Sequence, residues 1–159
     1  MSTLFVDTIN EKTSGNGINI PGHVVQVQNG TTLTGGLSTT STSYVATGVK
    51  VTITPTSTNS KIYITANSGI QNGTGGGGTQ LSLYRKIGSG TSTFLHHQGG
   101  SGLISYDSGN NHITPGPFVL LDSPNTTSAV EYEINYRRYN TGTSYFFANA
   151  QIVAMEIAQ

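Results

Sequence analysis

Two pairs of neighbouring residues in this 159-residue chain have types that could do chemistry. His96 and His97 offer imidazole nitrogens, which bind zinc and other transition metals. Glu131 and Glu133 are two residues apart, and on one face of a strand this spacing places two carboxylates about 7 Å apart. That separation lies within the range found between the acid and the base of glycoside hydrolases. The two pairs therefore raise two hypotheses, a metal site and a sugar-cleaving site.

The histidine pair is better explained without a metal. Side chains of adjacent residues in a strand point to opposite faces, so His96 and His97 cannot hold one ion together. The other two histidines, His23 and His112, are distant in the sequence. A metal site shared between subunits on a threefold axis is the alternative. We expect one imidazole inside, one in solvent, and no metal or other cofactor.

The glutamate pair lacks the other parts of a catalytic site. The chain has no tryptophan to form a sugar platform and only 7 acidic residues. The glycine-rich run 73–78 lacks the Gly-Lys-Ser/Thr ending of a phosphate-binding loop, and we expect no helix after it. We predict that Glu131 and Glu133 are solvated carboxylates, with Arg137 on the same strand face. A glycosidase is the disfavoured alternative, and we expect a protein that is not an enzyme.

Composition narrows the class of partner. Charged residues make up 9% of the chain, against about 25% in ordinary soluble domains. The formal net charge is zero, and the densest basic clusters are two pairs, 85–86 and 137–138. Phosphate backbones are bound by larger basic surfaces, so we expect no nucleic-acid partner. No apolar run approaches the roughly 18 residues that span a bilayer, so we expect no membrane insertion.

The polar surface points to a place outside the cell. Ser, Thr, Asn, Gln and Gly must supply most of it, as in proteins that act outside cells or in assembled particles. The first residues show neither the basic region nor the long apolar region of a secretory signal. A specialised secretion system or cell lysis would then release the chain, and lysis points to a virus. Cysteine is absent, so disulfides and thiolate metal sites are excluded.

Alternating side chains predict the elements that position these residues. Residues 48–53 and 62–66 alternate between apolar and polar types on either side of a polar turn, which predicts an antiparallel pair of half-buried strands. Residues 129–139 alternate in the same way and precede a turn at 140–143 that predicts a hairpin into 145–149. The apolar run 118–121 is typical of a buried strand. About eight or nine short strands are expected, which indicates an all-β antiparallel sandwich, jelly-roll-like.

The chain divides into three parts by composition. Residues 1–30 are expected to be an extended N-terminal arm for anchoring and assembly, because its short strands could pair with a neighbouring protein. Residues 31–43 are rich in Ser, Thr and Gly and predict a linker. Residues 44–159 form the predicted body. The apolar residues expected to make the arm's contacts are Leu4, Val6, Ile9, Ile18, Ile20, Val24, Val25 and Val27.

Several segments resemble virion structural and tail-fibre proteins of tailed phages, especially those that infect cyanobacteria. They are STLFVDTIN (2–10), GINIPGHVVQV (17–27), GVKVTITP (48–55), SKIYI (60–64), LDSPNTT (121–127) and AMEIA (154–158). The resemblance implies a small jelly-roll domain that is presented on a virion surface and forms a homotrimer. The long shaft and the tail-docking domain of large fibre proteins are absent from this sequence.

Aromatic residues near the C-terminal end are candidates for a subunit interface. Aromatic side chains bury large areas and are enriched at interfaces. The candidates for a trimer interface around a threefold axis are Tyr139, Tyr145, Phe146 and Phe147. The alternative is that these aromatic residues fill the core of the monomer.

One loop has the composition of a binding site. Binding residues concentrate on loops held by a rigid scaffold, and a mixture of aromatic and adaptable polar residues is typical of recognition loops. The candidates for binding the host cell are His96, His97, Tyr106, Asp107, Asn110 and Asn111; an ordinary exposed loop is the alternative. The sequence thus predicts a tail-fibre or receptor-binding tip subunit, anchored by its arm to other virion proteins and binding a host surface glycan or protein. A capsid decoration protein is the competing prediction. Either would be made in the host cytoplasm, released by lysis and placed on the virion surface.

Overall fold

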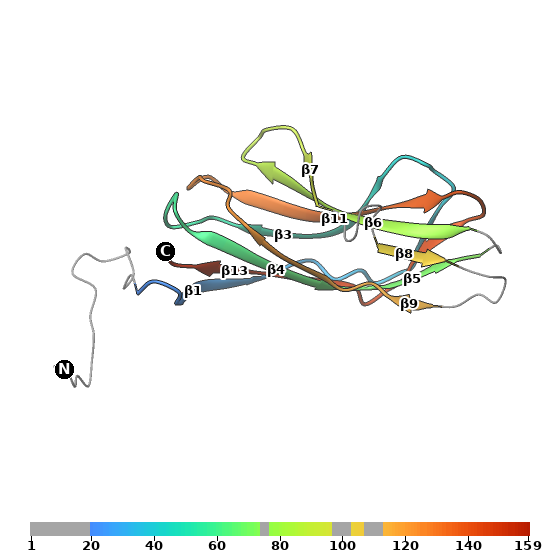
Figure 1. Cartoon of the computed structure of the whole chain (residues 1–159), viewed down its shortest axis with the longest axis horizontal. Coiled ribbons are helices and arrows are strands. Elements are labelled where there is room, and N and C mark those ends of the chain that lie inside the picture. The colour runs from blue at the N-terminus through green and yellow to red at the C-terminus, as the bar shows by residue number, and fades with distance from the viewer. Residues whose placement is uncertain (1–19, 74–76, 97–102, 107–112) are drawn as a thin grey trace.

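The computed structural model describes residues 20–73, 77–96, 103–106 and 113–159, and the regular elements in these ranges are all strands (Figure 1). The strands are β1 (Val24–Asn29), β2 (Leu37–Thr39), β3 (Val45–Ile53), β4 (Lys61–Asn67), β5 (Gly69–Asn72), β6 (Gly78–Ile87), β7 (Thr93–His96), β8 (Leu103–Tyr106), β9 (Thr114–Pro115), β10 (Phe118–Asp122), β11 (Val130–Tyr139), β12 (Ser144–Phe146) and β13 (Gln151–Ile157). Every pairing between them is antiparallel.

The strands form two layers. The first, which we call the β6 sheet, has the order β3-β11-β6-β7, and β8 pairs with β6 as well. The second consists of two sheets with the orders β1-β13-β4-β10 and β2-β12-β5-β9. The two orders match strand for strand. In sequence, β1 is next to β2, β13 next to β12, β4 next to β5, and β10 next to β9. Backbone hydrogen bonds such as Phe147 N to Gly69 O (2.9 Å) and Gly116 N to Ser68 O (2.7 Å) bridge the break between them. We call this long second layer the β4 layer.

The strand order defines the fold as a jelly roll. Counting β1–β2, β4–β5, β7–β8, β9–β10 and β12–β13 as single interrupted strands leaves eight long strands. In chain order they pair as 1-8-3-6 in the β4 layer and 2-7-4-5 in the β6 sheet. Two four-stranded sheets of this kind are the jelly-roll arrangement. The predicted all-β, jelly-roll-like sandwich is therefore confirmed.

The core lies between the two layers and follows from the alternation. Every second residue of β4, and of β3 from Thr47 onward, is buried, whereas the residues between them are partly or fully exposed. The largest fully buried side chains include Tyr132 and Tyr136 of β11, and the rings of Tyr136 and Phe146 lie 5.7 Å apart. Aromatic rings thus supply volume that the few aliphatic residues of this chain do not.

The predicted strand partners were wrong in two places. Strand β3 pairs with β11, and β4 pairs with β13 and β10, so the two strands expected to form a hairpin lie in opposite layers. Likewise β11 pairs with β3 and β6, whereas β12 pairs with β2 and β5. Alternation reveals which face of a strand is buried, but it does not identify the neighbour across the ladder. The connections 54–60 and 140–143 cross between the layers.

The predicted boundaries of the arm and the linker were also wrong. Strand β1, expected to lie in the arm, pairs with β13 along the edge of the β4 layer. Val24, Val25 and Val27 therefore belong to the body. The linker contains β2, and Leu33 and Leu37 pack against the core. An edge strand such as β1 has a neighbouring strand on one side only. Its apolar and polar side chains therefore alternate weakly, and the sequence pattern did not assign it to the sheet.

Four of the expected arm residues, Leu4, Val6, Ile9 and Ile18, lie outside the described residues, and Ile20 is exposed. The start of β1 is held next to the end of the chain. Gly22 N donates to Ala158 O (2.8 Å), and Ala158 N donates to His23 O (2.9 Å).

Replacing Gly30 by alanine is expected to destabilise the fold by about 2 kcal/mol. Gly30 follows β1, and its N–H donates to Ile152 O at 2.8 Å. A Cβ atom there would overlap the Ile152 side chain and the Lys50 carbonyl oxygen, which belong to the two layers. Thermal unfolding would show the loss as a fall in Tm of roughly 4–8 °C. Gly35→Ala is the matched control, because nothing lies within 4 Å of its Cβ position; equal Tm values for the two variants would contradict the steric argument.

Candidate functional site

Two of the residues predicted to bind a host surface, His96 and Tyr106, lie in strands at one edge of the β6 sheet. Strands β7 and β8 both pair with β6, with His96 opposite Leu83 and Tyr106 opposite Gly78. They are thus two halves of one interrupted strand. His97, Asp107, Asn110 and Asn111 lie outside the described residues. The binding role of this segment stays a prediction.

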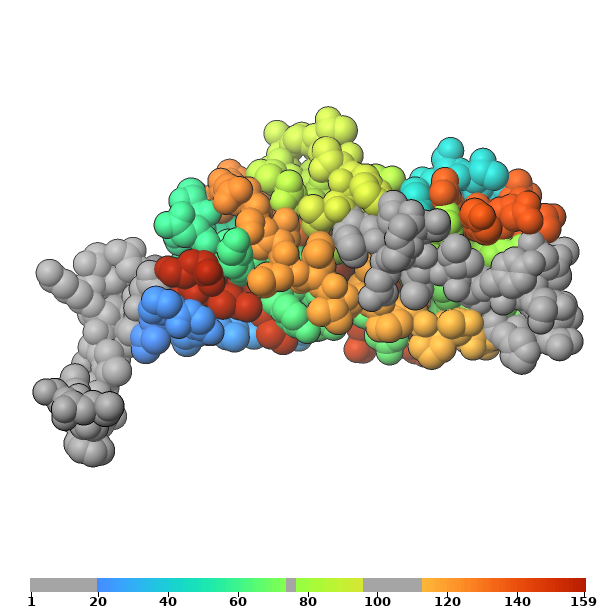
Figure 2. Space-filling model, viewed as in Figure 1, coloured from blue at the N-terminus to red at the C-terminus, as the bar shows by residue number. Residues whose placement is uncertain are grey.

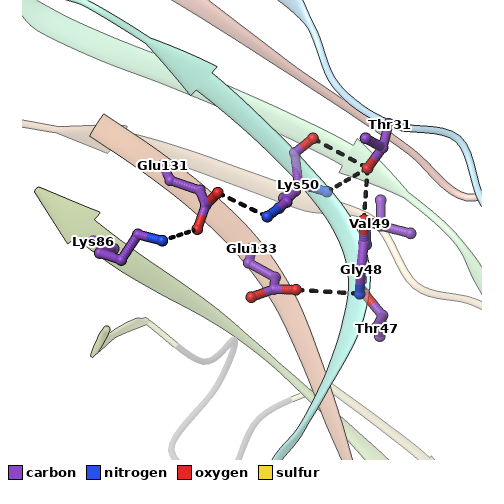
Figure 3. Close-up of polar contacts among 8 residues, drawn as sticks. All are labelled: Thr31, Thr47, Gly48, Val49, Lys50, Lys86, Glu131 and Glu133. Carbon is purple, nitrogen blue, oxygen red and sulfur yellow. Dashed lines mark hydrogen bonds and ion pairs between the residues drawn. The ribbon is translucent and has the colours of Figure 1, made fainter. Parts of the chain in front are cut away.

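The two glutamates suspected of catalysis are part of a polar ladder on the outer face of the β6 sheet (Figure 3). Glu131 forms ion pairs with Lys50 (2.9 Å) and Lys86 (2.8 Å). Hydrogen bonds from these two ammonium groups hold the pKa of Glu131 below its ordinary value. A carboxyl group of this kind stays ionised at neutral pH, which does not suit a proton donor. The expected neighbour, Arg137, is not its partner.

Glu133 has a backbone partner. Its Oε1 accepts a hydrogen bond from Gly48 N at 3.2 Å, where the chain has a φ of 76°. The hydroxyl group of Thr31 supports the same turn, because it donates to Gly48 O at 2.6 Å and accepts from Lys50 N at 3.0 Å (Figure 3). The positive φ of Gly48 is a conformation that favours glycine. The glutamate therefore stabilises a bend in β3.

Within the described ranges, no group of three or more His, Cys, Asp or Glu side chains is placed to hold a metal ion. In the same ranges, no helix is long and apolar enough to cross a membrane.

A cluster of aromatic rings lies on the outer face of the β6 sheet. The ring of Tyr84 is 6.1 Å from that of Tyr44 and 5.8 Å from that of Phe94, in edge-to-face arrangements. The guanidinium carbon of Arg137 lies 4.7 Å from the centroid of the Tyr44 ring. Phe94 is 46% exposed and belongs to the β6–β7 hairpin, which projects from the molecule (Figures 1 and 2). We call these four residues the aromatic platform.

Arg137 is held in place by neutral groups. Its Nε donates to Gln80 Oε1 at 2.6 Å, and Nη1 donates to Thr42 O at 3.1 Å. No carboxylate pairs with this guanidinium group in the part of the chain that the structure describes. Among these described residues, then, no carboxylate balances the positive charge of Arg137. It is oriented by two hydrogen bonds and by stacking on the ring of Tyr44.

One further feature marks the platform as a place for a polar ligand. Burial raises the pKa of the Tyr44 phenol, against the opposing effect of Arg137, so its hydroxyl group stays protonated at neutral pH. Oriented donors and acceptors next to aromatic rings are typical of sites that bind small polar molecules.

The sequence did not reveal the platform, because its members are far apart in the chain. Tyr44 precedes β3, Tyr84 lies in β6, Phe94 in β7 and Arg137 in β11. The pairing of β6 with β11 places Gln80 opposite Arg137. One signal was present: Leu81 and Leu83 define the inner face of β6, so Tyr84 had to lie on the outer face.

The aromatic residues proposed for a subunit interface do not share one environment. Phe146 is fully buried in the core of the monomer, so its assignment to an interface was wrong. Its place in the sequence next to exposed aromatic residues concealed this, since side chains alternate along β12. Tyr139 is 43% exposed and Tyr145 is 37% exposed, whereas Phe147 is half-buried.

Comparison with known proteins supports the fold. No protein-family model and no curated protein sequence matches this chain. A chain in the structure of infectious bursal disease virus, Gx strain, superposes with a TM-score of 0.56 and 15% identity over 87% of this chain. The present chain spans only 33% of that virus chain. Eiger TNF from S. frugiperda gives a TM-score of 0.50 and 9% identity, with 88% of this chain and 95% of that chain covered.

At these identities the comparisons define a class of fold. This chain is an antiparallel β-sandwich of the jelly-roll type, similar to a part of a virus-particle chain and to a TNF. The resemblance of its sequence to tail-fibre proteins stays a prediction.

Proposed function

We propose that this protein is a structural component of a virus particle and that it binds a host cell-surface glycan as a tail-fibre or receptor-binding tip subunit. The observation that carries the proposal is the aromatic platform on the outer face of a jelly-roll sheet. Two arguments lend weight to the particle: the fold is similar to part of a chain from a virus structure, and the surface is poor in charge.

The chemistry of the platform selects an acidic sugar. Aromatic rings stack on the apolar faces of pyranose rings, and the Phe94 ring is the most exposed of the three. Arg137 carries a charge that no described carboxylate balances, and a guanidinium group binds a carboxylate with strong, oriented hydrogen bonds. A uronic or sialic acid would supply both the ring face and the carboxylate.

Replacing Arg137 by alanine is expected to weaken binding of carboxylated oligosaccharides at least about 10-fold, because a charged hydrogen bond is worth about 1.5–3 kcal/mol. Phe94→Ala should weaken binding of acidic and neutral sugars alike, since it removes a stacking surface. The measurement is an array of uronic and sialic acid oligosaccharides beside their neutral counterparts, followed by titration of the best ligand. Thr91→Ala, in the turn before β7, is the control and should bind as the parent does. Binding that is unchanged by both platform substitutions, or confined to a host protein, would contradict the glycan proposal.

A capsid decoration protein is the second candidate. It is favoured by exposed apolar side chains on the edge strands of the β4 layer, Val27 of β1 and Val119 and Leu121 of β10, which suit packing against a shell. Immunogold labelling of intact particles distinguishes the two, because gold on the tail supports the tip and gold on the head supports decoration.

A further inference from the structure

Strand β3 contains an irregularity that shifts its register against β11. Lys50 lies opposite Glu133, but the next pair along the two strands is Ala46 opposite Asn135. Residues 47–49 of β3 thus face a single residue of β11, so two of the three are extra and form a β-bulge. Because the shift is an even number of residues, the inner and outer faces of β3 stay the same on both sides of the bulge.

The shift decides which side chain of β3 meets Arg137. Since Val45 lies opposite Tyr136, the next residue, Tyr44, lies opposite Arg137. Regular pairing without the bulge would place Ala46 there instead. A methyl group offers no ring face to a guanidinium group, whereas the centroid of the Tyr44 ring lies 4.7 Å from the guanidinium carbon. The bulge therefore brings together the tyrosine and the arginine of the aromatic platform.

Side chains from β3, from β11 and from the segment after β1 stabilise the bulge (Figure 3). Gly48 N donates to Glu133 Oε1 at 3.2 Å, and Thr31 Oγ1 donates to Gly48 O at 2.6 Å. On the inner side, Thr47 Oγ1 donates to Ile134 O at 2.7 Å. Gly48 has a φ of 76°, and nothing lies within 4 Å of a Cβ atom placed on it. Glycine is therefore needed here for its backbone conformation and not for lack of space.

We propose that this bulge positions the ligand-binding groups of the aromatic platform, and that Glu133 is a positioning residue because it fixes the register in which Tyr44 stacks on Arg137. The identity of the ligand rests on the proposed function, whereas the register does not. Bulges re-aim side chains beside functional sites. A stacked guanidinium group has already lost conformational freedom that a free one would lose on binding, so the stack strengthens binding of a carboxylate.

Nuclear magnetic resonance tests the register without any ligand. In the parent protein, nuclear Overhauser effects should connect the Tyr44 ring to the Arg137 side chain, and the ring should shift the Arg137 resonances upfield. Tyr44→Leu defines the spectrum without the stack. Gly48→Val should lose the contact and give Arg137 resonances close to those of Tyr44→Leu, since a β-branched residue disfavours a positive φ. Gly48→Asn should retain the contact, because asparagine tolerates this conformation; the non-glycine residues with a positive φ in the described ranges are all asparagines.

Gly22→Val is the matched control for backbone strain. Gly22 has a φ of 84°, nothing lies within 4 Å of its Cβ position, and it precedes β1 in the other layer. Both valine variants should lose stability, but only Gly48→Val should lose the contact between Tyr44 and Arg137. If Gly48→Val does not fold, Glu133→Ala replaces it, since that variant removes the acceptor for Gly48 N and leaves the residues of β3 unchanged. Glu133→Gln, which keeps an acceptor, should restore the contact that Glu133→Ala weakens.

Binding is then measured with trigalacturonic acid and sialyllactose as probes. For a probe that the parent binds, Gly48→Val should raise the dissociation constant about 3- to 10-fold, as Tyr44→Leu should, while Gly22→Val should leave it unchanged. The inference is overturned if the parent lacks the contact, if Gly48→Val or Glu133→Ala retains it in full, or if the contact is lost and the probe binds as before. A parent that binds neither probe, but loses the contact in Gly48→Val alone, would contradict the glycan proposal and support the register.

Discussion

Replacing Glu156 by glutamine is expected to lower the free energy of unfolding by about 3 kcal/mol, since the change leaves buried donors facing an amide group. Glu156 is fully buried at the inner face of β13. Its Oε1 accepts from Thr56 N (2.7 Å), Thr56 Oγ1 (2.7 Å) and Ser60 Oγ (2.6 Å), and its Oε2 accepts from Gln26 Nε2 (2.6 Å).

The effect is large because this one carboxylate joins three parts of the chain. Gln26 lies in β1, and Thr56 and Ser60 lie in the connection 54–60 that crosses from one layer to the other. Glutamine can accept at only one of its two positions, and its NH2 group opposes the donors at the other. Thermal unfolding is expected to show a fall in Tm of roughly 6–12 °C.

The matched control is Glu133→Gln, since Glu133 is half-buried and accepts a single hydrogen bond from Gly48 N. That variant should lose less than about 1 kcal/mol. If both variants lose the same amount, the carboxylate of Glu156 is not the special contact that its hydrogen bonds indicate.

The same carboxylate predicts how stability depends on pH. Burial alone would raise the pKa of Glu156, but hydrogen bonds from Ser60, Gln26 and Thr56 outweigh it and hold the pKa below its ordinary value. The folded state therefore binds this proton less readily than the unfolded state does. Its contribution to stability is present above the unfolded pKa of about 4.3 and is lost as the pH falls through the lower pKa of the folded state. Between neutral pH and pH 3, Tm should fall less steeply in Glu156→Gln than in the parent.

Replacing Asp122 by alanine is expected to lower the free energy of unfolding by about 3 kcal/mol, because it leaves a partly buried guanidinium group without a counter-charge. Asp122 lies in β10 and is 8% exposed. Arg85 Nη1, from β6, is 2.9 Å from both of its carboxylate oxygens. The hydroxyl group of Tyr132, from β11, donates to Asp122 Oδ2 at 2.7 Å. The three side chains connect the two layers through the core.

Tyr132→Phe separates the hydrogen bond from the ion pair. Burial, and then the neighbouring Asp122, raise the pKa of Tyr132 well above its usual value, so the phenol remains a donor at neutral pH. Its removal should cost about 1 kcal/mol, far less than Asp122→Ala. Denaturant titration of both variants gives the comparison, and a loss below about 2 kcal/mol for Asp122→Ala would show that water relieves the unpaired Arg85.

Much of the fold could be predicted because burial follows alternation. The inward positions of β3, β4 and β11 are those that the sequence indicates, and they alone define an all-β sandwich. The partners of each strand could not be predicted, since a jelly roll joins segments far apart in the chain. Glu156 illustrates the limit: AMEIA reads as the end of a strand, and only the crossing connection 54–60 shows why a charged residue faces inward.

Less of the candidate site could be predicted. The position of Glu131 and Glu133 on the outer face followed from the alternation, whereas their partial burial and their lysine and backbone partners came from neighbouring strands. Tyr44, Tyr84, Phe94 and Arg137 meet only through strand register. No local pattern brings them together, because stacking across a sheet depends on which strands are neighbours.

The pairing of β1 with β13 has a consequence for synthesis. Strand β1 is completed by residues 151–157, which are synthesised long after it. Contacts this distant in sequence form slowly, and until they form the open sheet edges can pair with other nascent chains. This sandwich therefore cannot close before β13 has been synthesised, and premature termination before β13 yields a polypeptide that cannot close its β4 layer.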